Sequence, residues 1–291
     1  MNGFIPRVAA IHDLSGFGRC SLTTAIPILS VMGIQVCPLP TAILSSHSDG
    51  LGDFSFLDFT PYMSDFIQHW KELDLEFSCI YTGFLGSYEQ IEIVSQFMDD
   101  FKTKPEQLIV VDPVMGDEGK LYVTYTEKMG RAMLSLVRKA DVITPNMTEA
   151  CFLLQKPYVD YVLSHKEAKE LLKELAELGP HKVVVTGVPL PEDSHGNLGY
   201  DKHKDLFFHA PIDYVPEIYP GTGDMYASVL TGSIIMGDSL DIAMDRATAF
   251  VEAAAKGTYN AKTFNKEGVA FEQILGHFFT ESHKKKVHLF E

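Results

Sequence analysis

Short apolar runs alternate with helical segments along most of the 291-residue chain, and this alternation limits its fold more than any other feature. The runs predicted to be buried strands are Arg7–Ile11, Ile34–Leu39, Phe77–Tyr81, Leu108–Val111, Asp141–Thr144 and Lys182–Val185. Strands that alternate with helices form a mostly parallel sheet covered by helices on both faces. His195–Tyr200 and Leu206–Ala210 have no helix between them and predict an antiparallel edge. We therefore expect an α/β fold.

The pattern continues without a linker, a repeat or a shift in composition, so residues 1–291 are predicted to form one domain. Hydrophobic residues make up 46% of the chain and charged residues 22%, which is ordinary for a globular protein. A chain of this length can bury a sizeable core.

Charge and cysteine usage exclude several classes of partner. The net charge of -15 argues against binding to nucleic acid or to an anionic membrane, and the basic cluster Lys284–Lys286 is predicted to be a solvated tail. No apolar run approaches the ~20 residues of a membrane span. Cys20, Cys37, Cys79 and Cys151 show neither metal-binding nor redox spacing, and the N-terminus does not resemble a signal peptide. These features predict a cytoplasmic protein.

Polar or glycine residues follow the predicted strands. They are His12-Asp13, Thr82-Gly83, Asp112-Pro113, Thr144-Pro145-Asn146 and Thr186-Gly187. The carboxyl ends of parallel strands meet at one edge of a sheet, where ligands bind in open α/β folds. The sequence therefore predicts one binding site at this edge.

The segment Pro220-Gly221-Thr222-Gly223-Asp224 directly precedes the predicted helix Met225–Met236. Two glycines allow close approach of a ligand, and the N–H groups of a helix start favour an anion. An aspartate beside a phosphate suits the removal of a proton from a nucleophile that attacks the phosphate. The alternative is an ordinary loop with an acid in the first helical turn, and the motif alone favours neither.

Two further acids lie near predicted strand ends. Asp112 could hold magnesium, which takes few carboxylates, although an Asp-Pro pair also ends strands without any such role. Asn146 and Glu149 predict a capping box at a helix start. The same geometry directs both side chains toward the strand edge, where they could contact phosphate and magnesium-bound water.

Other loops carry weaker signals. Ser15-Gly16-Phe17-Gly18 begins like a dinucleotide fingerprint but lacks the third glycine, and no GxxxxGK[ST] occurs. Ala42–Gly52 is predicted to be a polar loop. Its Ser45–Ser48 segment offers hydroxyls and an imidazole to a small polar ligand, or is a plain solvent loop.

Taken together, GTGD before a helix, DPVMGD after a strand, TPN-x-x-E and VVTG resemble the ribokinase superfamily from Val8 to about Lys256. Within it, Thr82–Ser87 (TGFLGS), DPVMGD and Leu44–Ser48 (LSSHS) are similar to segments of the vitamin B6 kinases. The sugar-kinase lid is missing. The resemblance therefore implies a ribokinase-like three-layer α/β/α fold without a separate lid domain.

The resemblance also implies an activity: ATP-dependent phosphorylation of the 5'-hydroxymethyl group of pyridoxal, pyridoxamine or pyridoxine, giving pyridoxal 5'-phosphate or its vitamer phosphates. Asp224 would be the base, with the N–H groups of Gly221, Thr222 and Gly223 as the anion hole. Asp112 and Glu149 would organise Mg²⁺. The other implied contacts are Asn146, Thr144 and Thr186 along the triphosphate, Val215 and Tyr219 near the adenine, and Asp13, Ser48, His47 and Phe84 around the substrate ring. Relatives imply a homodimer, and superfamily members often use K⁺.

Three positions depart from the B6 kinase pattern. Asp13 replaces a serine and is more like the hydroxymethylpyrimidine kinases of thiamine synthesis, while Phe84 replaces a tyrosine and Ser48 a threonine. A hydroxymethylpyrimidine kinase is therefore the first alternative. A non-catalytic binder of B6 or nucleotide is the second, although a binder has no need of a base such as Asp224. The sequence does not rank the three vitamers.

Overall fold

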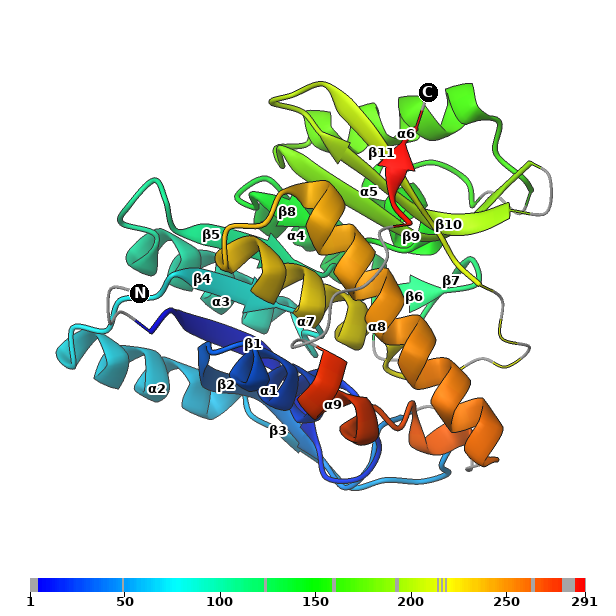
Figure 1. Cartoon of the computed structure of the whole chain (residues 1–291). Helices are drawn as coiled ribbons and strands as arrows, with labels where there is room; N and C mark the ends of the chain where they lie inside the picture. Colours follow the sequence, from blue (N-terminus) through cyan, green and yellow to red (C-terminus); the bar gives the residue numbers. More distant parts are fainter. Residues whose placement is uncertain are drawn as a thin grey trace.

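The computed structural model describes residues 5–48, 50–122, 125–158, 161–191, 194–213, 215, 217, 219–262, 265–278 and 286–290. Ten strands form one sheet in the order β12-β11-β10-β9-β8-β5-β4-β1-β2-β3, with helices on both faces (Figure 1). The predicted three-layer α/β/α arrangement is confirmed.

Six neighbouring strands of the sheet run parallel, as predicted. They are β1 (Arg7–Ser15), β2 (Gln35–Leu44), β4 (Cys79–Thr82), β5 (Leu108–Val111), β8 (Val142–Ile143) and β9 (Lys182–Leu190). Three of them extend further than the apolar runs predicted. Ser15 pairs with Leu44, so β2 includes the first three residues of the predicted polar loop. Backbone pairing with a neighbouring strand thus continues the ladder beyond the apolar side chains.

The sheet has antiparallel strands at both edges. The pair β10 (Ser194–Asp201) and β11 (Leu206–Pro211) was predicted. The edge strands β3 (Phe56–Asp58) and β12 (His288–Leu289) were not, because two or three exposed residues carry no periodic signal. β6 (Gly116–Asp117) and β7 (Lys120–Leu121) form a separate small hairpin.

Alternating side chains of β1 show how the two helical layers are held. Ala9 and Ile11 belong to one core with α2 (Thr60–Glu72), α3 (Tyr88–Phe101), α4 (Glu127–Val137), α5 (Met147–Leu153) and α6 (His165–Glu177). Val8 and Ala10 belong to the other core, with α1 (Ser21–Val31), α7 (Thr222–Ile235), α8 (Leu240–Ala261) and α9 (Glu272–Phe278). A strand buried on both faces is continuously apolar, as Val8–Ile11 is. A short 3-10 helix, Asn265–Glu267, joins α8 to α9.

The basic cluster near the C-terminus differs in part from the prediction of a solvated tail. Lys286 forms ion pairs with Asp213 and Glu252, while Lys284 and Lys285 lie outside the described residues. Within the described ranges, every helix is too short or too polar to cross a membrane.

Candidate active site

Backbone hydrogen bonds link the five neighbouring strands β1, β4, β5, β8 and β9 and bring the predicted strand-end residues together. Gly83 N–H donates to Ile11 O at 3.0 Å, Asp112 N–H to Thr82 O at 2.9 Å, and Thr144 N–H to Val111 O at 3.2 Å. Thr186 N–H donates to Pro145 O at 3.0 Å. Asp13, Asp112, Thr144 and Thr186 therefore lie along one edge of the sheet.

Gly221 is the N-cap of α7 and has a φ of 79°. A Cβ added there would lie 1.9 Å from the carbonyl oxygen of Arg19, so only glycine fits. Gly223 is exposed, and a Cβ on it would meet no atom within 4 Å. The first turn of α7 is therefore open beside Gly223, and the N–H groups of a helix start favour an anion in such a space.

The start of α7 differs from the prediction. The helix begins at Thr222 rather than at Met225, because the first turn of a helix tolerates residues of low helix propensity when its N–H groups face outward. Thr222 donates its hydroxyl to Tyr219 O at 3.3 Å, which ties the first helical residue to the preceding loop. Asp224 is thus the third residue of the helix.

Asp224 is half-buried, and burial raises its pKa from 3.8 to about 7. The charge of Asp13 raises this pKa further, whereas the backbone N–H of Ser21 lowers it. A general base works best with a pKa near the operating pH. Asp224 therefore has the protonation behaviour that a catalytic base requires.

Asp13 is almost fully buried and accepts two serine hydroxyls. Ser21 Oγ donates to Asp13 Oδ1 at 2.5 Å and Ser15 Oγ to Asp13 Oδ2 at 3.1 Å. Burial raises the pKa of Asp13, and the two hydroxyls oppose that rise.

Sequence reasoning did not assign a role to these serines, of which Ser21 is the first residue of α1. Ser21 has a φ of 48°, a left-handed conformation that is uncommon outside glycine and clusters at functional sites. Its hydroxyl contacts Asp13 and its N–H acts on Asp224, so it links the two acids.

Asp112 and Glu149 form a second pair of buried acids. Burial raises the pKa of Asp112 to about 8, the charge of Asp224 adds to the rise, and the Thr144 hydroxyl opposes it. Burial and then the charge of Asp112 raise the pKa of Glu149 well above its usual value. The anion of Asp112 is thus destabilised by Asp224, and the anion of Glu149 by Asp112.

The predicted capping box is confirmed at the start of α5. Asn146 N–H donates to Glu149 Oε2 at 2.9 Å, and Glu149 N–H donates to Asn146 Oδ1 at 2.9 Å. Met115 N–H donates to Glu149 Oε1 at 3.0 Å, and Asn146 Nδ2 donates to Gly116 O at 2.9 Å. Both oxygens of Glu149 are therefore already engaged by backbone groups.

These acids fit a magnesium ion held mainly by water and phosphate. Among the described residues, no three His, Cys, Asp or Glu side chains converge as a ready-made metal site. Mg²⁺ does not need one, because it keeps several waters and takes one or two carboxylates plus substrate phosphates. Asp112 is available to such an ion directly and Glu149 through water, and a divalent cation would relieve their mutual repulsion.

The residues expected along the nucleotide lie on neighbouring elements. Asn146 forms an isolated parallel bridge with Thr186. Thr186 lies inside β9 rather than after a strand end, because β9 continues to Leu190. Tyr219 is buried in the core that includes α7 and α8, and Val215 packs against the same core.

The residues expected around the substrate ring differ in their surroundings. A ring nitrogen of His47 lies 2.7 Å from Lys266 O, and a Cβ on Gly18 would lie 2.0 Å from the same ring. Phe84 is half-buried and its carbonyl accepts the Thr41 hydroxyl at 3.0 Å. Ser48 is exposed. His47 also lowers the pKa of Asp13 by its charge, which places its ring on the Asp13 side of the site.

His12, next to Asp13, was not assigned a role from sequence. It is fully buried, stacks edge-on against Tyr81 at 4.4 Å, and burial lowers its pKa to about 3. The imidazole is therefore neutral at physiological pH. Gly83 leaves room for it, since a Cβ there would lie 2.2 Å from His12 Nδ1.

Comparisons with known proteins find kinases among the relatives of this chain. The family model for phosphomethylpyrimidine kinase matches residues 55–268. The thiamine biosynthetic bifunctional enzyme TH1 of Arabidopsis thaliana is 26% identical over 94% of this chain, which spans 50% of that protein's length. A pyridoxal kinase of Arabidopsis thaliana is 30% identical over 87% of this chain and 82% of its own length.

A solved structure is more similar still. A candidate phosphomethylpyrimidine kinase of Bacteroides thetaiotaomicron, crystallised with pyridoxal, is 45% identical to this chain. It superposes with a TM-score of 0.93 over 98% of this chain and 100% of that one. The expected fold is thus shared along nearly the full length of both proteins.

Proposed function

Because this chain belongs to the phosphomethylpyrimidine kinase family and is a kinase, we propose that it transfers the γ-phosphoryl group of ATP to the 5'-hydroxymethyl group of a B6 vitamer. The observation that carries the proposal is Asp224, an acid with a pKa raised to about 7 in the first turn of α7. The Bacteroides relative crystallised with pyridoxal supports the substrate class.

In the proposed reaction, the hydroxymethyl oxygen of the vitamer attacks the γ-phosphorus while Asp224 accepts its proton. The bond between the γ-phosphorus and the β,γ-bridging oxygen breaks, and ADP leaves. The N–H groups of Gly221, Thr222 and Gly223 hold the charge of the transferring phosphoryl group, and Asn146, Thr144 and Thr186 orient the triphosphate. Asp112 directly and Glu149 through water would hold Mg²⁺, which would supply positive charge against the phosphates. Positioning and charge stabilisation supply most of the rate in such reactions.

The proposed vitamer site is bounded by Asp13, His47, Ser48 and Phe84, and the proposed adenine site by Val215 and Tyr219. An ionised Asp13 would accept a hydrogen bond from a protonated ring nitrogen, a phenol or an amine. Its carboxyl is buried and already holds the Ser15 and Ser21 hydroxyls, so it is oriented before a ligand arrives. Pre-orientation of this kind favours a ligand that presents a donor at one fixed place.

Hydroxymethylpyrimidine is the second candidate substrate. Asp13 favours it, and so does the similarity to the thiamine biosynthetic enzyme. ADP release measured with pyridoxal, pyridoxamine, pyridoxine, hydroxymethylpyrimidine and ribose separates the candidates in one experiment. Turnover of hydroxymethylpyrimidine alone would replace the proposal with the second candidate. Ligand binding without any turnover would favour a non-catalytic binder.

The role of Asp224 is tested by Asp224→Asn, which keeps the shape of the side chain and removes the base. Loss of a general base lowers rates by about 10²–10⁴-fold, and we expect kcat to fall within that range while ADP binding survives. Asp74→Asn is a matched control, because Asp74 lies in the loop after α2. Full turnover by Asp224→Asn would exclude it as the base.

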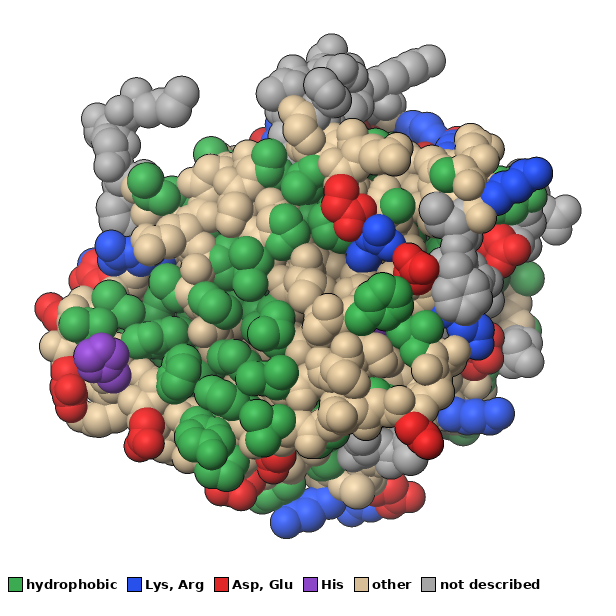
Figure 2. Space-filling view, turned by 90° about the horizontal axis from the view of Figure 1, so that it is seen from below, with side chains coloured by type: hydrophobic (Ala, Val, Ile, Leu, Met, Phe, Trp, Pro, Cys, Tyr) green, Lys and Arg blue, Asp and Glu red, His purple; other side chains and the backbone are tan. Residues whose placement is uncertain are grey.

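We also propose that the protein is a cytoplasmic homodimer that is assisted by K⁺. Its four cysteines form no disulfide bond, which suits a reducing compartment. Figure 2 shows hydrophobic side chains gathered over one part of a face, at the end of the molecule where α1, α2, β2 and β3 lie in Figure 1. The exposed apolar side chains of these elements include Val31, Phe56, Leu57, Tyr62 and Phe66.

Patches of this kind mark association surfaces. Light scattering coupled to gel filtration should give twice the monomer mass for the native protein, and Phe66→Glu should reduce it. A native monomer at micromolar concentration would exclude the dimer. Equal turnover in a buffer with K⁺ and in a K⁺-free buffer would exclude a role for K⁺ in the reaction.

A further inference from the structure

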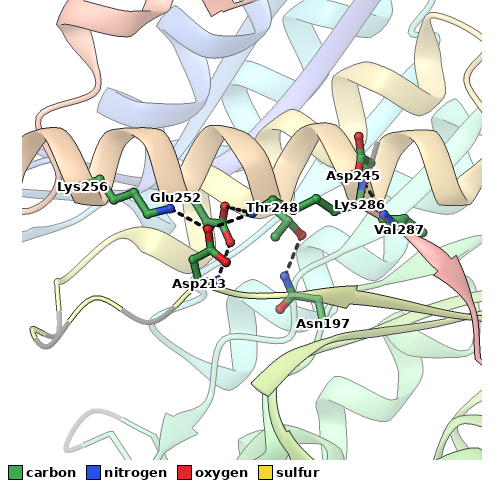
Figure 3. A network of polar contacts seen from close by, with 8 residues as sticks. All are labelled: Asn197, Asp213, Asp245, Thr248, Glu252, Lys256, Lys286 and Val287. Carbon is green, nitrogen blue, oxygen red and sulfur yellow. Dashed lines mark hydrogen bonds and ion pairs between the residues drawn. The ribbon is translucent and has the colours of Figure 1, made fainter. Parts of the chain in front are cut away.

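One side of α8 carries a row of polar side chains at helical spacing: Asp245, Thr248, Glu252 and Lys256. Figure 3 shows that these residues bind three segments that lie far apart in the sequence. The segments are the middle of β10 through Asn197, the stretch after β11 through Asp213, and the C-terminal tail through Lys286 and Val287. The row therefore ties α8 to three neighbouring parts of the sheet edge, since β10 pairs with β11 and β11 pairs with β12.

Asp213 is fixed at both its backbone and its side chain. Its N–H donates to Glu252 Oε1 at 2.6 Å, and its Oδ2 accepts Lys256 Nζ at 2.8 Å and Lys286 Nζ at 2.9 Å. Hydrogen bonds from these two lysines lower the pKa of Asp213 to about 2. Asp213 begins the segment that contains Val215 and Tyr219 and ends at the Gly221 N-cap of α7.

The backbone at Lys286 is also held by hydrogen bonds. Its own N–H and that of Val287 donate to Asp245 Oδ1 at 2.6 and 3.1 Å. Val287 is buried, and β12 pairs with β11 two residues further on. The backbone of Lys286 is therefore held against α8 and beside the sheet, which keeps its side chain within reach of Asp213 and Glu252.

Lys286 separates two negative charges. Its Nζ lies 3.0 Å from Glu252 Oε2 and 2.9 Å from Asp213 Oδ2, and Glu252 is only 7% exposed. Without this ammonium, the buried Glu252 carboxylate would face the Asp213 carboxylate. Lys256 would remain, but of these two acids it pairs only with Asp213. Removing one member of a buried charge network leaves the remaining charge uncompensated and is costly. Asp213 can relieve that cost, because it is the more exposed acid and begins a loop.

The same helix face also supports the opposite side of the proposed nucleotide site. Thr248 Oγ1 accepts Asn197 Nδ2 at 3.0 Å, and Asn197 Oδ1 accepts the Gly187 N–H at 3.1 Å. Gly187 follows Thr186, the residue assigned to the triphosphate. Asn197 and Thr248 are uncharged and make no hydrogen bond to the described part of the tail, residues 286–290. The tail therefore acts only on the part of the site that follows Asp213.

We propose that Lys286, through Asp213 and Glu252, positions Val215 and Tyr219 for binding the adenine nucleotide. Lys286 is thus a positioning residue that the C-terminal tail supplies to the ATP site. The inference rests on the proposed function, because that function assigns Val215 and Tyr219 to the adenine.

The test compares Lys286→Met with Lys104→Met. Lys104 is a matched control, since it pairs with Glu76 at 2.7 Å and its side chain is 45% exposed, against 42% for Lys286. We expect Lys286→Met to raise the KM for ATP about fivefold, in the range found for residues that couple to a site without touching its ligand. The KM for pyridoxal should stay unchanged. Calorimetric titration with Mg-ADP should show the same fivefold loss of affinity.

Two further variants separate positioning from general destabilisation. Lys286→Arg keeps the charge and should retain native affinity for Mg-ADP. The Lys286→Met, Asp213→Asn double variant removes the repulsion as well as the lysine, and it should recover most of the lost affinity. If Lys286 only stabilised the fold, the second substitution would lower the affinity for Mg-ADP further instead of restoring it.

The possible results are distinct. Native affinity and KM for ATP in Lys286→Met would overturn the inference and leave the proposed function standing. Equal losses for ATP and pyridoxal, or no recovery in the double variant, would also overturn it. A native protein that neither binds Mg-ADP nor turns over any substrate would overturn the proposed function and this inference together.

Discussion

Gly221→Ala should separate the catalytic geometry of the α7 start from its contribution to folding. The Cβ of alanine would lie 1.9 Å from the Arg19 carbonyl oxygen, whereas ordinary van der Waals contact begins at 3.4 Å. The two backbone segments must therefore move apart by about 1.5 Å, the difference of those distances. The left-handed φ of 79° adds roughly 1–2 kcal/mol of strain for a residue with a side chain.

This displacement falls on the N–H groups assigned to the transferring phosphoryl. A misplacement of about 1 Å at a reacting centre can cost about 10²-fold in rate, so we expect kcat for pyridoxal phosphorylation to fall at least that far. The free energy of unfolding should fall by about 2–3 kcal/mol, since strain and a partly relieved clash add. Steady-state ADP release and chemical denaturation measure the two effects.

Two other glycines provide matched controls. Gly237→Ala carries a similar backbone strain, at a φ of 98°, but its Cβ meets no atom within 4 Å, so it should lose stability without losing kcat. Gly223→Ala also meets no atom, but it places a methyl group in the open space before α7, so it should stay folded and lose kcat. Native kcat in Gly221→Ala, or equal kinetic losses in Gly221→Ala and Gly237→Ala, would refute the reasoning.

Three more predictions follow from the buried acids. The kcat/KM for pyridoxal should rise about tenfold per pH unit and level off near the Asp224 pKa of about 7, because only the ionised base accepts a proton. Asp13→Asn should move this rising part of the pH profile to lower pH, because the charge of Asp13 raises the pKa of Asp224. An unchanged profile would argue against coupling of the two acids. Ser21→Ala leaves a buried Asp13 oxygen without its hydroxyl donor and should cost about 1–3 kcal/mol in chemical denaturation, more than Ser15→Ala at the longer 3.1 Å contact; equal losses would contradict the ranking. The folded protein keeps protons on Asp112 and Asp224 that the unfolded chain releases above pH 4, so stability should fall as pH rises from about 4 to about 8. Added Mg²⁺ should therefore raise the melting temperature more at pH 8 than at pH 5, and an equal gain at both would exclude these acids as its ligands.

The layers of the fold could be predicted from the sequence because they depend on strong local patterns. Leu108–Val111 has the bounds predicted for it, since it is a clear apolar run. The ends of β1, β2 and β9 could not, because backbone pairing rather than apolar side chains continues those strands. β3 and β12 depend wholly on the neighbour that they pair with.

The candidate site could likewise be predicted only in part. Strand-end position predicted that Asp13, Asp112 and Thr144 would meet, since parallel strands share an edge. It could not predict that Ser15 and Ser21 hold Asp13, because those contacts depend on how β1 turns into α1. Nor could it predict the place of His47, which lies beside Gly18 and contacts Lys266, a residue far away in the sequence. The roles assigned to these residues stay predictions.

The helix that carries Asp224 has a consequence for how the protein loses activity on heating. Residues 225–233 of α7 are all buried, between α1, α8 and the sheet. A segment enclosed in this way belongs to the most cooperative part of a protein and opens only when the whole molecule unfolds. The Asp224 end of the site therefore cannot melt ahead of the rest, and hydrogen exchange in α7 should report global unfolding. Heat inactivation and loss of tertiary structure should then follow one curve, so activity itself becomes a measure of the folded fraction.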